Sequence, residues 1–274
     1  MKYIKLGFKL VLYWHLDITR QKILGKIFHF QTVKLLERAN IIVATSSLYI
    51  DGSPYLSKYR SKCICIPNCI NETRLNITDT IKRKADQICQ ENFGKIICFA
   101  IGRHIPYKGF SYLVKASMYL DSRFRIFIGG NGELTKKLKS KALGDDKIVF
   151  LGRISDEDMI SYYLAMDIFC FPSITKNEAF GIALAEAMYF GKPAVTFNIN
   201  GSGVNYVCLN RENCIEVENR NVEAYAEAMR KLADNPELRS KMGKAGKKRV
   251  EEHFLSFIFR EKILGVLKKN ENNY

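Results

Sequence analysis

The sequence has no long apolar run and no pattern typical of export. No stretch of its 274 residues approaches the roughly 18 apolar residues that a membrane-spanning helix needs. The first residues are interrupted by Lys2, Lys5 and Lys9, and they lack a small-residue cleavage site. We therefore interpret residues 1–14 as a strand with its approach rather than as a signal peptide, and we expect a cytoplasmic protein.

Patterns for nucleic-acid and metal binding are also missing. No RNP, zinc-finger or basic-zipper pattern occurs, so nucleic acid is not an expected partner. Cys63, Cys65 and Cys69 suggest a metal site, but the first two alternate with isoleucines as in a strand, and no fourth ligand is evident. Free cysteine behaves mainly as a small apolar residue. We expect no metal, no cofactor and no disulfide scaffold.

Charge of one sign dominates what is present. Lys and Arg total 43 against 28 Asp and Glu, which gives a formal net charge of +15. Such an excess favours anionic partners, such as phosphorylated ligands or an acidic membrane face. The charge alone does not choose among these partners, and a peripheral protein at the inner face of the cell membrane fits it.

Short apolar runs alternate with amphipathic stretches along most of the chain. This alternation predicts an α/β architecture with parallel sheets, in which buried strands are nearly continuous in apolar residues. The expected strands are residues 10–14, 41–44, 63–66, 96–101, 124–128, 148–151, 168–171 and 194–197, and a long helix is expected over 19–39.

The sequence divides into two unequal parts. The stretch 91–254 contains a full set of strand–helix units, which predicts a complete Rossmann-like domain. Residues 1–90 contain about three strands, too few for a complete doubly wound domain. Residues 255–274 are expected to form a helix that can cross back to the first part.

The strongest chemical signal lies in residues 177–188, which follow an expected strand. Gly181 at the strand-to-helix turn lets the backbone approach a ligand closely, and the helix start offers free N–H groups to an anion. Glu178 in the loop and Glu186 in the helix would face one bound molecule from different directions. Alternatively, Glu186 is a solvated helix residue and Glu178 complements the helix dipole.

A second signal, in residues 102–110, also follows a strand and begins a helix. Arg103 and Lys108 place two cations at the carboxyl end of that strand, where α/β sheets bind ligands. Together they suit a diphosphate. The alternative is a pair of surface charges in a loop.

The two signals together predict chemistry without a metal. A nucleotide-sugar donor releases a nucleoside diphosphate, and preorganised cations and helix dipoles stabilise its growing negative charge. Some enzymes use a metal held by Asp-x-Asp instead, and residues 156–158 match that pattern. However, Ser155 precedes them, and Ser155 with Asp158 is typical of a helix capping box.

Together these motifs resemble glycosyltransferase family 4, retaining enzymes of the GT-B fold with two Rossmann-like domains that face each other. The resemblance covers about residues 10–254 and includes the Glu-x7-Glu spacing and the Arg-x4-Lys pair. Phe-Leu-Gly-Arg-Ile at 150–154 and Phe-Pro-Ser at 171–173 also match. The N-terminal domain is predicted to be incomplete, because the family's earlier strands and glycine-rich loop have no counterpart here.

The resemblance also implies residue roles. Arg103 and Lys108 would hold the diphosphate, Glu178 would lie by the donor sugar, and Glu186 would bind the ribose hydroxyls. His15, which ends an expected strand, matches the family's active-site histidine. The remaining donor-binding residues that the resemblance implies are Arg153 and Ile154 near the base, with Phe180, Gly181 and Ile182.

The expected function is therefore hexosyl transfer from a nucleotide-diphosphate sugar to a lipid-linked or polysaccharide acceptor in bacterial surface glycan synthesis. Residues 197–209 look most like bacterial O-antigen mannosyltransferases, which indicates mannose from GDP-mannose. Two alternatives stay open. One is a shortened donor-binding remnant with weak or no turnover, and the other is a different enzyme on the same scaffold, such as a sugar-nucleotide epimerase.

Overall fold

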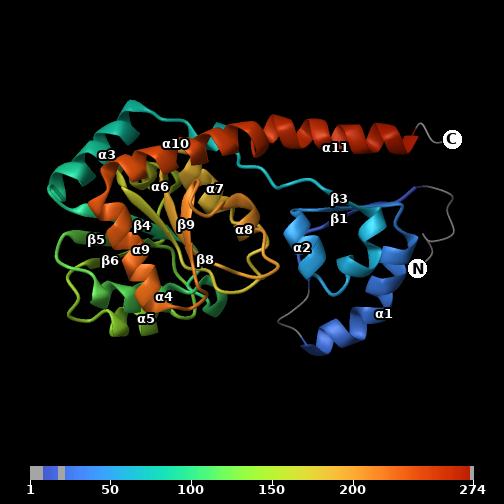
Figure 1. The fold of residues 1–274 in the computed structure, drawn as a ribbon, viewed down its shortest axis with the longest axis horizontal. Coiled ribbons are helices and arrows are strands. Elements are labelled where there is room, and N and C mark those ends of the chain that lie inside the picture. Colours follow the sequence, from blue (N-terminus) through green and yellow to red (C-terminus); the bar gives the residue numbers. More distant parts are fainter. Residues whose placement is uncertain (1–8, 18–21, 272–274) are drawn as a thin grey trace.

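The computed structural model describes residues 9–17 and 22–271, and it contains two parallel β-sheets, each covered by helices (Figure 1). The first sheet has the order β1-β2-β3, with every strand parallel to its neighbour. Its elements are β1 (Val11–Trp14), α1 (Lys22–Arg38), β2 (Ile41–Ala44), α2 (Ser47–Gly52), the 3-10 helix η2 (Leu56–Lys62) and β3 (Cys63–Cys65).

The second sheet has six parallel strands in the order β6-β5-β4-β7-β8-β9. The strands are β4 (Ile96–Ile101), β5 (Phe124–Gly129), β6 (Ile148–Gly152), β7 (Ile168–Phe171), β8 (Ala194–Phe197) and β9 (Cys214–Val217). Because β4 and β7 lie side by side in the middle, the chain reverses its direction of travel across the sheet there. Such a reversal creates a ligand-binding crevice at the carboxyl ends of the strands.

Helices cover both faces of the second sheet (Figure 1). One layer contains α3 (Asp79–Glu91), α6 (Asp156–Ala165), α7 (Ile182–Tyr189) and α10 (Pro236–His253). The other contains α4 (Phe110–Ala116), α5 (Thr135–Lys141) and α9 (Val222–Asp234). Short helices connect these elements: η3 (Glu72–Leu75), η4 (Pro106–Lys108), η5 (Ser117–Tyr119) and α8 (Val204–Val207).

The central strands are buried on both faces, as their apolar sequences require. All four residues of β7 and of β8 are inaccessible or nearly so, including Thr196, which lies near the sulfur of Cys208. Strand burial of this kind supplies most of the favourable free energy of the fold. The sequence prediction missed β9, because its outward residues are half-exposed and Glu216 interrupts the apolar run.

The core of the second sheet begins before the boundary predicted at residue 90. Buried side chains of α3, namely Ile81, Ala85 and Ile88, belong to that core and not to the first sheet. The short β-strand 63–65 and the polar stretch after it obscured this arrangement in the sequence. Cys208, directly after α8, forms a disulfide with Cys214 at the start of β9, a pairing that the cysteine spacing did not reveal.

Helix α11 (Ser256–Glu271) returns to the first sheet (Figure 1). We call the first sheet with its helices the first unit, and the second sheet with its helices the second unit. Phe259, Ile263 and Val266 of α11 pack with Val43 and Ile66 of the first unit in a small apolar cluster. At the crossing point the Glu72 carboxylate accepts hydrogen bonds from the Ser256 backbone N–H at 3.1 Å and from its hydroxyl at 2.6 Å. The first sheet therefore takes part of its core from the C-terminal end of the chain.

Substituting Val266 should show how much the first sheet depends on α11. Val266 is 9% exposed, whereas Leu267, its neighbour on the same helix, is 42% exposed. Val266→Asp buries an unpaired polar group, so we expect it to lower the free energy of unfolding by about 1–3 kcal/mol. The matched Leu267→Asp should change little. Equal thermal unfolding midpoints for the two variants would contradict this docking.

Candidate active site

The loops that follow β4, β7 and β8 lie together, because neighbouring parallel strands end at one edge of the sheet. Gly109 shows how close the first two loops come. It has φ +67°, and a Cβ placed there would lie 1.9 Å from the carbonyl oxygen of Pro172. The backbone N–H of Ile174 also donates to the Tyr107 carbonyl at 2.9 Å. The 102–109 loop is thus attached to the end of β7.

This attachment brings Lys108 to Glu178. Lys108 Nζ lies 2.6 Å from Glu178 Oε2, and their side chains are 17% and 11% exposed. The Ser173 hydroxyl donates to the same carboxylate oxygen at 2.9 Å. Because both charges are largely removed from water, their attraction is screened less than that of a surface pair. A cation and an anion from separate loops therefore form the centre of the site.

Helix α7 starts beside this pair. Gly181 at its N-terminus has φ +93° and no side chain to cap the helix. The first N–H groups of a helix have no partners within the helix, and together they carry a partial positive charge. This end of α7 is suited to an anion.

Glu186 lies one turn into α7 and is 9% exposed. Its Oε2 accepts a hydrogen bond of 3.1 Å from the Tyr163 hydroxyl. Burial raises the pKa of the Glu186 carboxyl, and the effects of Tyr163 and of the positive charge of Arg74 oppose that rise. Glu186 is thus a nearly enclosed carboxylate with one fixed donor, and the solvated-helix alternative is wrong.

The Asp-x-Asp match at 156–158 is a helix start. The Ser155 hydroxyl accepts from the Asp158 N–H at 3.1 Å, which confirms the predicted cap. Asp156 pairs with Arg74 through two hydrogen bonds, and Asp158 pairs with Lys84. Over residues 9–17 and 22–271, no three His, Cys, Asp or Glu side chains are grouped so that they could hold a metal ion.

The loops of the two units meet at the same edge. Thr45, which follows β2, donates through its hydroxyl to the Ala179 carbonyl at 3.2 Å. Lys176 donates to the Gly52 carbonyl at 2.8 Å. His15, directly after β1, is exposed, and its ring lies 4.3 Å from that of Tyr13. The segment that carries Glu178 therefore packs against the loops of the first sheet.

The family of the chain follows from comparison with known proteins. Residues 82–249 match the family described as glycosyl transferases group 1. The chain belongs to this family. It is 30% identical over 249 residues to the D-rhamnosyltransferase WbpZ of Pseudomonas aeruginosa, covering 89% of this chain and 63% of that protein. It is 29% identical to the O-antigen chain mannosyltransferase C of Escherichia coli, covering 89% of this chain and 64% of that protein.

Solved structures share the fold of this chain. Anabaena Alr3699/HepE in complex with UDP and glucose superimposes with a TM-score of 0.81 at 15% identity, over 95% of this chain and 71% of that one. Sucrose-phosphate synthase from Thermosynechococcus elongatus gives 0.82 at 19% identity, over 98% and 69%. The predicted GT-B fold, with two Rossmann-like domains, is confirmed. The chain spans less than two thirds of the length of its rhamnosyl- and mannosyltransferase relatives.

The predicted site residues differ in how the structure places them. Lys108 and Glu178 are in contact beside Gly181, and Glu186 lies one turn into α7 with Tyr163. Arg103 and Arg153 are exposed and make no side-chain hydrogen bond or ion pair within the described chain. Ile182 is 48% exposed at the start of α7. Ile154 is half-buried and packs on the core of the second sheet.

Phe180 differs from what its place in the motif suggests. Its ring is 2% exposed and lies edge-on to Phe254, 5.3 Å between centroids. Its side chain therefore packs in the core, and only its backbone faces the loops. Sequence reasoning missed Tyr163 and Thr45, because single Tyr and Thr residues carry no signal of their own in a sequence. It matched Ser173 only as part of the Phe-Pro-Ser motif and did not predict its contact with Glu178.

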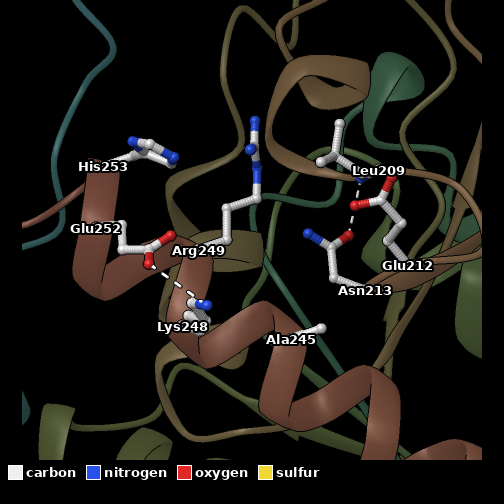
Figure 2. A pocket seen from close by; sticks show the side chains of 8 residues that line it. All are labelled: Leu209, Glu212, Asn213, Ala245, Lys248, Arg249, Glu252 and His253. Atoms are coloured by element: carbon white, nitrogen blue, oxygen red, sulfur yellow. Dashed lines mark hydrogen bonds and ion pairs between the residues drawn. The ribbon is translucent and has the colours of Figure 1, made fainter.

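A separate pocket, shown in Figure 2, is lined by none of the predicted site residues. It has a volume of about 210 Å³ and lies between α10 and the segment before β9. Its lining mixes cations, carboxylates and apolar groups: Leu209, Glu212, Asn213, Ala245, Lys248, Arg249, Glu252 and His253. The Arg249 guanidinium donates to the Tyr206 and Val207 carbonyls, so this side chain is held by the backbone of α8.

Glu186 gives a pH-dependent test of the geometry. Its pKa is raised in the folded state. The protonated carboxyl therefore favours the fold below its unfolded pKa, and that contribution is lost as the pH rises through the folded pKa. We expect Glu186→Gln to gain stability relative to the parent chain as the pH rises above the usual pKa of a Glu carboxyl, measured by thermal unfolding. Glu227→Gln, at an exposed position of α9, is the control. A difference that is constant with pH would contradict the burial of Glu186.

Proposed function

We propose that the chain transfers a hexose from a nucleotide-diphosphate sugar, with retention of configuration and without a metal, to a lipid-linked or polysaccharide acceptor. The observation that carries this proposal is the 2.6 Å contact of Lys108 with Glu178 beside the uncapped start of α7. A fixed cation, a helix N-terminus and a carboxylate lie within one small region. These are the groups that diphosphate departure and sugar recognition require.

Lys108 would stabilise the leaving diphosphate. In the chain without ligand it neutralises Glu178, and a diphosphate arriving at α7 would compete for the same ammonium group. Glu178, still held by the Ser173 hydroxyl, would then accept hydrogen bonds from hydroxyls of the donor sugar. Arg103, exposed on the same loop as Lys108, would reach the diphosphate from solvent.

Glu186 would bind the ribose. Its Oε2 is engaged by Tyr163, so the second oxygen is available to a vicinal pair of hydroxyl groups. Hydrogen bonds to a charged group are worth about 1.5–3 kcal/mol. Arg153 and Ile154, at the end of β6, would lie by the base, with Ile154 presenting an apolar surface. His15 would act from the acceptor side.

Mannose from GDP-mannose is the proposed donor group. Relatives include an O-antigen mannosyltransferase, a D-rhamnosyltransferase and a GDP-mannose-dependent mannosyltransferase of Corynebacterium glutamicum. Their names also support a role in bacterial surface polysaccharide synthesis.

A lipid-linked acceptor would place the protein at the inner face of the cell membrane. The net charge of +15 favours an anionic surface. No helix in the described part of the chain has both the length and the apolar character required to cross a bilayer. Binding at the surface through basic side chains fits these observations.

A donor-binding unit with little turnover is the second candidate. The first sheet has three strands over the described residues, and the chain covers 63% of the rhamnosyltransferase relative. Under this alternative the second unit binds nucleotide, but the acceptor side does not complete the site. Transfer activity separates the two candidates.

The proposal is tested by sugar transfer in EDTA. With GDP-mannose and a lipid-diphosphate acceptor, we expect a mannosylated product that retains the configuration of the donor sugar, both with and without EDTA. Glu186→Ala should weaken GDP binding roughly 10-fold or more, on the scale of one charged hydrogen bond, whereas Glu178→Gln should mainly lower transfer. GDP binding by the parent chain without transfer would favour the second candidate. Loss of binding in EDTA that magnesium restores would contradict metal independence.

A further inference from the structure

Asp17 is a buried charge that the functions assigned above do not use. It is 3% exposed, and it lies two residues after His15. Its Oδ1 accepts hydrogen bonds from Trp14 Nε1 at 3.1 Å and from the Ser53 hydroxyl at 2.8 Å. Its backbone N–H donates to the Tyr49 hydroxyl at 2.6 Å. These contacts fix both the backbone and the carboxylate.

The second carboxylate oxygen of Asp17 points out of its own unit. Oδ2 is buried and has no hydrogen-bond partner, while Lys176 Nζ lies 3.8 Å away. Lys176 belongs to the loop after β7, and its ammonium also donates to the Gly52 carbonyl at 2.8 Å. An unpaired buried carboxylate is costly. The charge of Asp17 therefore requires a cation that the other unit supplies.

The two units come together closely around this pair. A Cβ placed on Gly52 would lie 2.6 Å from the Cα of Gly201, which follows β8. Three residues after Lys176, the Ala179 carbonyl accepts a hydrogen bond from the Thr45 hydroxyl. The 175–179 loop is thus held at several points, and the Asp17–Lys176 contact joins opposite charges there.

We propose that Asp17 and Lys176 are a pair of positioning residues that sets the acceptor-side segment of His15 against the donor-side loop of Glu178. His15 lies two residues before Asp17, and Glu178 lies two residues after Lys176. The ion pair therefore links the segments that carry these two groups. This inference rests on the proposed function. Small errors in the separation of two such groups reduce rates strongly, with a 1 Å displacement costing about 10²-fold.

A double-mutant cycle tests the pair. Lys176→Met removes the charge and keeps the length, Asp17→Asn keeps the shape, and the double variant closes the cycle. We expect transfer kcat to fall at least about tenfold in each single variant and not to fall further in the double variant, because coupled residues are not additive. Nucleoside diphosphate affinity, measured with GDP, should stay within about twofold. Lys176→Arg should retain most of the activity.

The control is Lys247→Met, which removes an exposed ion pair with Glu251 on α10 and should change neither quantity. Three results would overturn the proposal: additive losses, kcat within twofold of the parent in Lys176→Met, or a large loss of GDP affinity at unchanged kcat. The last would make Lys176 a nucleotide-binding residue.

A second measurement distinguishes failure of the proposed sugar transfer from failure of the Asp17–Lys176 pairing. If the parent chain transfers no sugar, the same cycle is measured by thermal unfolding, which needs no substrate. We then expect the loss of melting temperature in the double variant to be smaller than the sum of the single losses by about 2–4 °C. Additive losses would show that Asp17 and Lys176 do not act together, whatever the chain catalyses.

Discussion

The site depends on backbone segments that approach one another too closely for any side chain. A Cβ on Gly109 would lie 1.9 Å from the Pro172 carbonyl oxygen, and a Cβ on Gly203 would lie 1.9 Å from the Ala179 carbonyl oxygen. The first contact joins the loop after β4 to the end of β7, and the second joins the loop after β8 to the segment before α7. Without these two approaches, Lys108 and Glu178 would not meet at 2.6 Å.

The same edge of the sheet also connects the two units. Parallel strands place all their carboxyl ends on one side, so the loops of the first sheet meet those of the second across a single boundary. Thr45 and Gly52 from the first unit contact the 175–179 loop there. The short segment that carries Glu178 therefore also carries contacts between the two sheets.

Much of this was predictable from the sequence. Strands buried on both faces, such as 96–101, 168–171 and 194–197, were predicted with the bounds that the structure has, because their apolar runs are unbroken. The sequence did not predict the half-exposed β9, and it did not predict that α3 belongs to the core of the second sheet. Glu178 and Glu186 were found through their motif, whereas Asp17 and Lys176 come together from segments far apart in the chain, a contact that spacing along the sequence does not encode.

Hydrogen exchange with bound nucleotide tests the central claim most directly, namely that the loops after β4 and β7 form the diphosphate site. We predict that saturating GDP, in EDTA, slows exchange of backbone amides in residues 102–110 and 178–186. Residues 245–253, which line the pocket of Figure 2, should be unaffected. Protection concentrated at 245–253, or bound GDP without protection of either loop, would contradict the account.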